Sequence, residues 1–221
     1  MREPALDWPA YRSTALRHPK RPLIYLPDEL ADRTGPQLGD LRPGALEHDL
    51  TTDGPVGERI TVSGRLLDAA GRPIRDSLVE IWQANGAGRY AHRWDTWRAP
   101  LDPNFTGAGR TVTDGEGRYA FTTIKPGPYP WGNHANAWRP AHIHFSLLGR
   151  SFEQRLVTQM YFPADPLFAF DPIFNAVRDQ DARERMISSF SMDRSQENWT
   201  LAYEFDIVLG GRDATPIEDA F

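Results

Sequence analysis

The sequence predicts a mainly β protein: an antiparallel β-sandwich with long loops, one short helix and an extended proline-rich N-terminal arm. From residue 58 onward, short segments alternate apolar and polar residues and are separated by turn residues. The 19 prolines and 18 glycines in 221 residues indicate many turns rather than long helices. Only residues 173–190 space their apolar side chains as a helix does. We therefore expect one domain of six or seven short strands.

The first 50 residues contain seven prolines and no sustained helical periodicity. Such a segment buries little surface by itself, so we expect it to lie along the domain or a partner chain, with an unattached tail as the alternative for the first ten residues. We expect residues 1–55 to form an extended arm involved in subunit contacts, and residues 56–221 to form the β-sandwich domain that carries the functional site.

Within that domain, residues 59–68 and 77–84 alternate and are joined by a short turn, so we expect neighbouring strands. In residues 111–124, Asp114-Gly115-Glu116-Gly117 separates two alternating segments, which is a strong hairpin signal because glycine supplies the positive φ of tight turns. The remaining strands are expected over 141–149, 154–162 and 199–209, with the helix over 173–190.

Composition excludes several classes of function. The net charge is −5 and no long basic block occurs, so a nucleic-acid partner is disfavoured. The absence of cysteine excludes disulfides, thiolate nucleophiles and cysteine-based metal sites. No run of 18 apolar residues or signal-like start is present, so we expect a soluble, cytoplasmic protein with no membrane partner.

The stretch from Tyr129 to Phe145, YPWGNHANAWRPAHIHF, is the most informative part of the chain. If residues 141–145 form a strand, His142 and His144 point to one face while the apolar residues between and after them point to the other. Two imidazoles on one face suit a metal, although such a pair also occurs as ordinary packing. The large side chains Trp131 and Arg139 nearby favour a functional site.

Upstream, Gly86-Ala87-Gly88-Arg89-Tyr90 places a tyrosine in a glycine-rich loop directly after a strand. Together, the segments WQANGAGRY, DGEGRYAF, PGPYPW and WRPAHIHF resemble the intradiol ring-cleaving dioxygenases. These are non-haem iron(III) enzymes that use O2 to open catechols between their two hydroxyl groups. The resemblance extends over most of residues 55–210.

The resemblance implies a role for each matching position. The four iron ligands would be Tyr90, Tyr129, His142 and His144, with Tyr129 leaving the metal when substrate arrives. Arg139 would stabilise negative charge on the substrate ring, and Gln159 would be a polar group close behind the ligands. The substrate pocket would be lined by Trp131 and Ile173, with Trp82 packing nearby.

The donor types agree with the cofactor that the resemblance implies. Iron(III) is a hard cation and phenolate is a hard anionic donor, so two tyrosinates balance most of the metal charge. No dinucleotide fingerprint is present, and the implied chemistry requires no organic cofactor. A zinc hydrolase built on the histidine pair is the alternative, and it would need Asp, Glu or a third His as the next ligand.

Within the family, the proline-rich arm fits the branch that acts on protocatechuate better than the catechol and hydroxyquinol branches, which carry a helical N-terminal region. Catechol, hydroxyquinol or another substituted diol remains an alternative substrate. The resemblance further implies a hetero-oligomer with an α-type subunit, and the tryptophans in residues 93–98 are candidate subunit contacts. A metal-free assembly subunit with the same fold is the non-enzymatic alternative.

Overall fold

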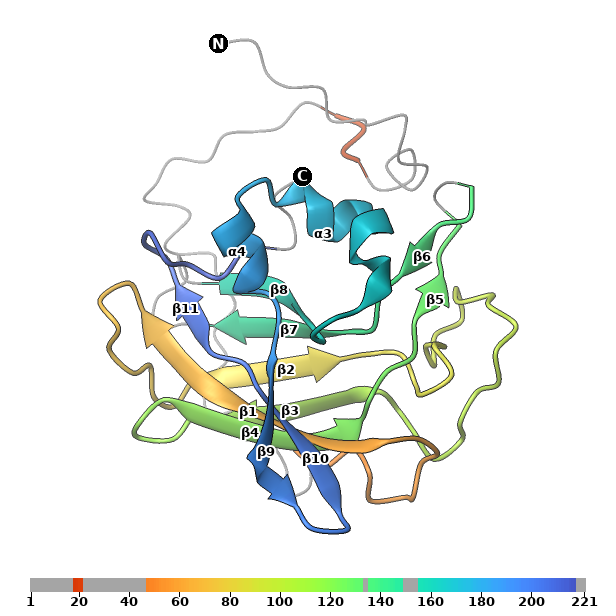
Figure 1. The fold of residues 1–221 in the computed structure, drawn as a ribbon, viewed down its shortest axis with the longest axis horizontal. Helices are drawn as coiled ribbons and strands as arrows, with labels where there is room; N and C mark the ends of the chain where they lie inside the picture. The colour runs from red at the N-terminus through yellow and green to blue at the C-terminus, as the bar shows by residue number, and fades with distance from the viewer. Residues whose placement is uncertain (1–17, 22–46, 133–134, 149–154, 218–221) are drawn as a thin grey trace.

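The computed structural model describes residues 18–21, 47–132, 135–148 and 155–217, and its strands form two main sheets that enclose a core (Figure 1). The first sheet has the order β11-β1-β10-β9, with β4 also paired to β1, and comprises β1 (Arg59–Asp68), β4 (Arg118–Ile124), β9 (Ser189–Gln196), β10 (Thr200–Glu204) and β11 (Ile207–Leu209). The second has the order β3-β2-β7-β8 and comprises β2 (Leu78–Trp82), β3 (Ala108–Val112), β7 (His142–Leu148) and β8 (Arg155–Tyr161). A separate ribbon pairs β5 (Tyr129–Pro130) with β6 (Trp138–Arg139).

Alternation along the strands determines which side chains enter the core. On β7, Ile143, Phe145 and Leu147 are completely buried among apolar residues of both sheets. Because successive strand residues point to opposite faces, His142 and His144 lie on the outer face of the second sheet. The predicted sandwich and the predicted orientation of the histidine pair are both found.

The pairing of the strands differs from the prediction in three respects. The first sheet is mixed rather than antiparallel, because β1 pairs in parallel with β10 and with β11. The strands over 59–68 and 77–84 are not neighbours, since β1 and β2 belong to different sheets. Alternation reports which face of a strand is buried and carries no information on its neighbour or direction, which explains these errors.

The third difference concerns the turn at 114–117, which forms but does not close a hairpin. The Asp114 carboxylate accepts hydrogen bonds from the backbone N–H groups of Glu116 and Arg118, each at 2.8 Å. The strands on the two sides of the turn belong to different sheets: β3, before it, to the second sheet and β4, after it, to the first. The turn therefore links the two layers of the sandwich.

In place of one helix over 173–190 there are two short helices, α3 (Pro172–Ala176) and α4 (Gln180–Glu184), and residues 189–190 already belong to β9. A 3-10 helix, η1 (Pro166–Phe170), precedes them. Val177 is extended with ψ 98°, which ends α3, and Asp179 caps a new helix by accepting a hydrogen bond from Ala182 N. The segment lies over the outer face of β8 (Figure 1). There Phe174 and Met186 form a buried cluster with Tyr161.

Residues 47–51 lie against β4: the N–H of Leu50 donates to the carbonyl of Thr122 at 2.9 Å, and Leu50 joins the core. Most of the predicted N-terminal arm, residues 1–17 and 22–46, lies outside the described residues, so the domain boundary at residue 55 stays a prediction. Among the helices that the structure describes, none is sufficiently long and apolar to cross a membrane.

The buried phenol of Tyr119 links the two sheets and gives a first prediction. Its hydroxyl donates to the carbonyl of Phe205 at 2.5 Å, and its ring packs against Phe145. Burial, with a further contribution from Asp206, raises the pKa of Tyr119 well above its ordinary value of 10. The unfolded chain therefore loses this proton first, so the stabilisation from Tyr119 is complete below about pH 10 and decreases as the pH rises above it.

We expect Tyr119→Phe to lower the free energy of unfolding by about 1 kcal/mol at pH 7, because the hydrogen bond is lost. Above about pH 10 this difference should shrink, which urea unfolding of both proteins at several pH values will measure. A difference that stays constant up to about pH 11 would contradict the assigned role of the phenol.

Candidate metal centre

The two histidines of β7 form the floor of the candidate site. His142 and His144 are 2% and 8% exposed, and their ring centroids are 4.9 Å apart. Strand register places Trp82 beside His144 on one side and Gln159 on the other. The Trp82 indole stacks on the His144 imidazole at 4.8 Å with an interplanar angle of 6°. The neighbouring strands thus fix the orientation of the His144 ring.

Tyr90 comes from the loop that follows β2, which Asn85 organises. The Asn85 side-chain oxygen accepts hydrogen bonds from the N–H groups of Ala87 and Arg89 at 3.0 and 2.9 Å. The N–H of Tyr90 itself donates to the Asp95 carboxylate at 2.8 Å. These bonds fold the loop back, so that Tyr90 turns toward the outer face of the second sheet.

The Tyr90 loop packs backbone to backbone against the loop that carries Tyr129. Gly88 has φ +79°, and a Cβ at this position would lie 2.2 Å from the carbonyl oxygen of Pro128. A Cβ on Gly127 would lie 2.6 Å from the carbonyl oxygen of Gly86. Only glycine permits this approach, which explains the glycines in the two loop motifs.

As a result, two phenols meet two imidazoles. The Tyr129 hydroxyl lies 3.4 Å from His142 Nε2, and the Tyr90 hydroxyl lies 3.2 Å from His144 Nε2. The two tyrosine rings meet edge to face with centroids 5.4 Å apart. The structure therefore brings together the four residues that the sequence predicts as ligands.

The surroundings of His142 keep its imidazole neutral, with one ring nitrogen available to bind a metal ion. Its Nδ1 donates to the carbonyl of Pro140 at 2.7 Å, which leaves Nε2 with a lone pair facing Tyr129. Burial, together with the charge of Arg139 and the neighbouring His144, lowers the pKa of His142 well below its ordinary value of 6.5. A neutral imidazole is the form that binds metal ions.

This set of donors fits a hard trivalent metal. Two phenol oxygens and two imidazole nitrogens converge in half-buried to buried positions, and phenolate oxygens favour iron(III) over softer ions. In the part of the chain that the structure describes, no group of three or more His, Asp or Glu side chains could hold a metal. The third ligand that the zinc alternative needs is thus absent from the described residues.

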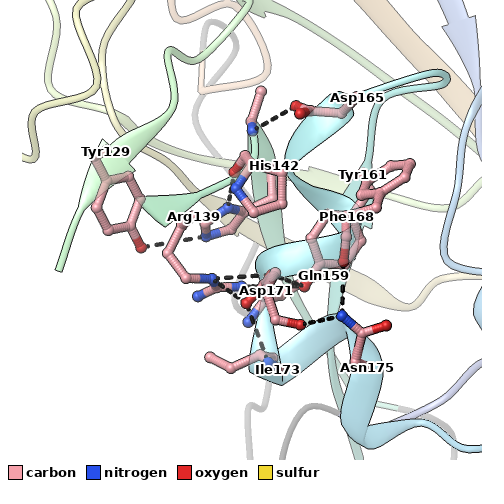
Figure 2. A network of polar contacts seen from close by, with 12 residues as sticks. Tyr129, Arg139, His142, Gln159, Tyr161, Asp165, Phe168, Asp171, Ile173 and Asn175 are labelled. Carbon is pink, nitrogen blue, oxygen red and sulfur yellow. Dashed lines mark hydrogen bonds and ion pairs between the residues drawn. The ribbon is translucent and has the colours of Figure 1, made fainter. Parts of the chain in front are cut away.

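Arg139 lies beside the candidate ligands in a buried polar network (Figure 2). Its Nε is 3.1 Å from both carboxylate oxygens of Asp171. Its Nη2 donates to Gln159 Oε1 and, at 3.1 Å, to the Tyr161 hydroxyl. Burial by itself lowers the pKa of Arg139, but the oxygens of Tyr161, Asp171 and Tyr129 outweigh this effect and raise that pKa above its ordinary value. The guanidinium is therefore a permanent charge next to the site.

The other predicted residues surround the same centre. Trp131 is half-buried with its ring 5.1 Å from the Arg139 guanidinium carbon, and Ile173 is half-buried on α3. Gln159 is completely buried, and its amide nitrogen has no hydrogen-bond partner among the described residues.

Two members of the network, Tyr161 and Asp171, are not found by sequence reasoning. Tyr161 could have been identified, because it follows Gln159 by two residues and so shares its face of β8. The Asp171-Pro172 pair signals the start of a helix, but the ion pair with Arg139 spans 32 residues and has no local signal.

Comparison with known proteins finds a relative that matches almost the whole chain. A family model described as "Dioxygenase" matches residues 34–211, and one described as "Protocatechuate 3,4-dioxygenase beta subunit N terminal" matches residues 4–29. The chain is 60% identical over 220 residues to the protocatechuate 3,4-dioxygenase beta chain of Burkholderia cepacia, covering 97% of this chain and 93% of that one. It is 32% identical over 165 residues to the protocatechuate 3,4-dioxygenase alpha chain of Pseudomonas putida, covering 74% and 77%.

Among solved structures, the 3-chlorocatechol 1,2-dioxygenase of Rhodococcus opacus has the same fold. The TM-score is 0.56 at 23% identity, covering 83% of this chain and 77% of that one.

The contact between the loops of Tyr90 and Tyr129 gives a second prediction. Gly88→Ala combines a strained positive φ with a clash against Pro128, and we expect it to lower the free energy of unfolding by about 2–3 kcal/mol or more. Because the clash separates the two loops, bound metal should also fall, as metal analysis of the purified protein will show.

Gly71→Ala is the matched control. Gly71 has φ +74°, but a Cβ at this position would meet nothing within 4 Å, so this variant carries only the backbone strain of about 1 kcal/mol. Equal stability losses and equal metal contents in the two variants would refute the proposed contact.

Proposed function

Because the chain belongs to the family of intradiol ring-cleaving dioxygenases, we propose that it is the catalytic subunit of a protocatechuate 3,4-dioxygenase. In this reaction O2 is inserted between the two ring carbons that bear hydroxyl groups, and the product is 3-carboxy-cis,cis-muconate. The observation that carries the proposal is the convergence of Tyr90, Tyr129, His142 and His144 on one point of the outer face.

The family uses non-haem iron, and the four converging side chains are the residues that would hold iron(III) in this chain. When bound, the metal would take up the substrate through both hydroxyl oxygens and make its ring reactive toward O2. Two tyrosinates and two neutral imidazoles leave one positive charge of the metal unbalanced, which suits the binding of a further anion.

Tyr129 is proposed as the group that accepts a substrate proton. A catechol must lose both hydroxyl protons to bind as a dianion, and a phenolate oxygen at the Tyr129 position is basic enough to take one of them. The Tyr129 ring lies on β5, paired with β6, at the edge of the site. The second proton would pass to hydroxide from the solvent, so no separate carboxylate or histidine base is required.

Arg139 is proposed to stabilise negative charge that develops on the substrate ring. Its guanidinium is buried, permanently charged and already held by three polar neighbours, so little reorganisation is needed during the reaction. Trp131 and Ile173 would line the substrate pocket, and Trp82 would orient the His144 ring by stacking on it.

We further propose that the subunit functions in a hetero-oligomer with an α-type chain, because the relative that matches almost the whole chain is named a beta chain. Residues 1–55 would form the arm that contacts other subunits, and residues 56–221 the catalytic domain. The Trp94 side chain is 73% exposed, which is costly on a free surface and agrees with a subunit contact.

The third prediction tests the function directly. The purified protein, co-expressed with an α-type chain, should contain iron and show a broad visible band from tyrosinate-to-iron(III) charge transfer. The band should shift to longer wavelength when protocatechuate is added without oxygen. A colourless protein saturated with zinc would refute the proposal, and faster turnover of catechol or hydroxyquinol would change the assigned substrate.

In the same assay, Tyr90→Phe should lower iron affinity by roughly 100-fold or more, because changing a residue that only orients a metal ligand already costs up to that amount. The band should be lost together with the iron. Tyr203→Phe is the control, because its hydroxyl contacts Lys125 and not the site. Full turnover by Tyr90→Phe would exclude Tyr90 as a ligand.

The fourth prediction concerns Tyr129. Tyr129→Phe should retain iron but slow the anaerobic binding of protocatechuate by about 100-fold, because a proton acceptor has been removed. Stopped-flow absorbance at several pH values measures this rate. Binding as fast as in the unmodified protein would exclude Tyr129 as the proton acceptor.

A further inference from the structure

Asp171 connects two parts of the candidate site that are far apart in the sequence. Its carboxylate is completely buried, and both oxygens lie 3.1 Å from Arg139 Nε. One of these oxygens also accepts a hydrogen bond at 3.1 Å from the N–H of Ile173 (Figure 2). A single side chain thus contacts the charged group beside the ligands and the first turn of α3.

The pairing determines where the Arg139 guanidinium points. The side chains of Arg139 and Asp171 are 3% and 0% exposed, so solvent screens the pair little and loss of the carboxylate would leave a buried charge without its counter-charge. Tyr161 completes the arrangement, because its hydroxyl donates to Gln159 Oε1 at 2.8 Å and accepts from Arg139. With Nε held by Asp171 and Nη2 held by two oxygens, the guanidinium plane has one orientation.

The same carboxylate fixes the helix that bears Ile173. Asp171 is the N-cap of α3, and Pro172 follows it at the first helical position. At only five residues, α3 is too short to be stable by itself, so the cap and the packing of Phe174 hold it in place.

We propose that Asp171 is a positioning residue, which acts through Arg139 by holding its guanidinium toward the reacting ring while it anchors the pocket wall at Ile173. This inference rests on the proposed function, in which Arg139 stabilises charge on the substrate. Asp171 itself touches neither substrate nor metal in this mechanism.

The test compares Asp171→Asn, Arg139→Met and the double variant in the iron-loaded hetero-oligomer. Asparagine caps a helix as well as aspartate does, so α3 should persist while the guanidinium loses its anchor. We expect kcat for protocatechuate to fall about 10- to 100-fold with KM changed less than about threefold, and the visible band to stay unchanged. The double variant should be no slower than Arg139→Met, because Asp171 acts only through Arg139.

A second readout needs no metal. In the metal-free protein, Asp171→Asn leaves a buried arginine unpaired and should lower Tm by on the order of 10 °C, whereas the double variant should recover part of this loss. Asp179→Asn is the matched control, because Asp179 caps α4 in an exposed position and lies in a different helix from the pair. It should leave kcat unchanged.

Asp171→Glu covers the case in which Asp171→Asn does not fold. It keeps the charge but displaces the carboxylate by one methylene group, so kcat should fall about tenfold while the protein keeps its iron. A folded Asp171 variant with unaltered kcat, or losses that add in the double variant, would overturn the positioning role. Absence of iron and turnover in the unmodified protein would instead refute the proposed function.

Discussion

The site depends on the burial of one face of β7. Ile143, Phe145 and Leu147 are completely removed from water at the centre of the core, and their transfer stabilises the fold by about 1.5–3 kcal/mol for each side chain. A shift in register by one residue would move all three to the outer face and place two imidazoles in the apolar core instead. The core therefore fixes His142 and His144 on the outer face, and every other part of the site is arranged relative to them.

A second constraint is the buried charge of Arg139. A guanidinium out of contact with water is tolerated only when acceptors surround it, and the network supplies them from β8 and from the start of α3. Burial lowers the pKa of His142, and the permanent positive charge of Arg139 lowers it further, so the imidazole stays neutral. One residue thus provides the proposed stabilisation of substrate charge and also helps to keep a proposed ligand neutral.

The histidine pair, the glycine-rich loops and the layered fold could be predicted from the sequence, because each depends on short spacings. Alternation predicts that His142 and His144 share a face, and the glycines of the Tyr90 loop mark a close approach of backbones. Strand order could not be predicted, since β1 and β2 alternate in the same way yet belong to opposite sheets. The pairing of Arg139 with Asp171 depends on the path of the chain between them, which local patterns do not report.

The two tyrosines are held in different ways, and the difference agrees with their proposed roles. Tyr90 follows a loop folded around Asn85, and its N–H is bound to Asp95. Tyr129 lies on a ribbon of two short strands that is separate from both main sheets. Displacing Tyr129 from a metal would rearrange only a ribbon of two-residue strands, whereas displacing Tyr90 would disturb a loop that Asn85 and Asp95 hold by hydrogen bonds. A ligand that leaves when substrate binds is therefore expected at Tyr129, and a ligand that stays bound is expected at Tyr90.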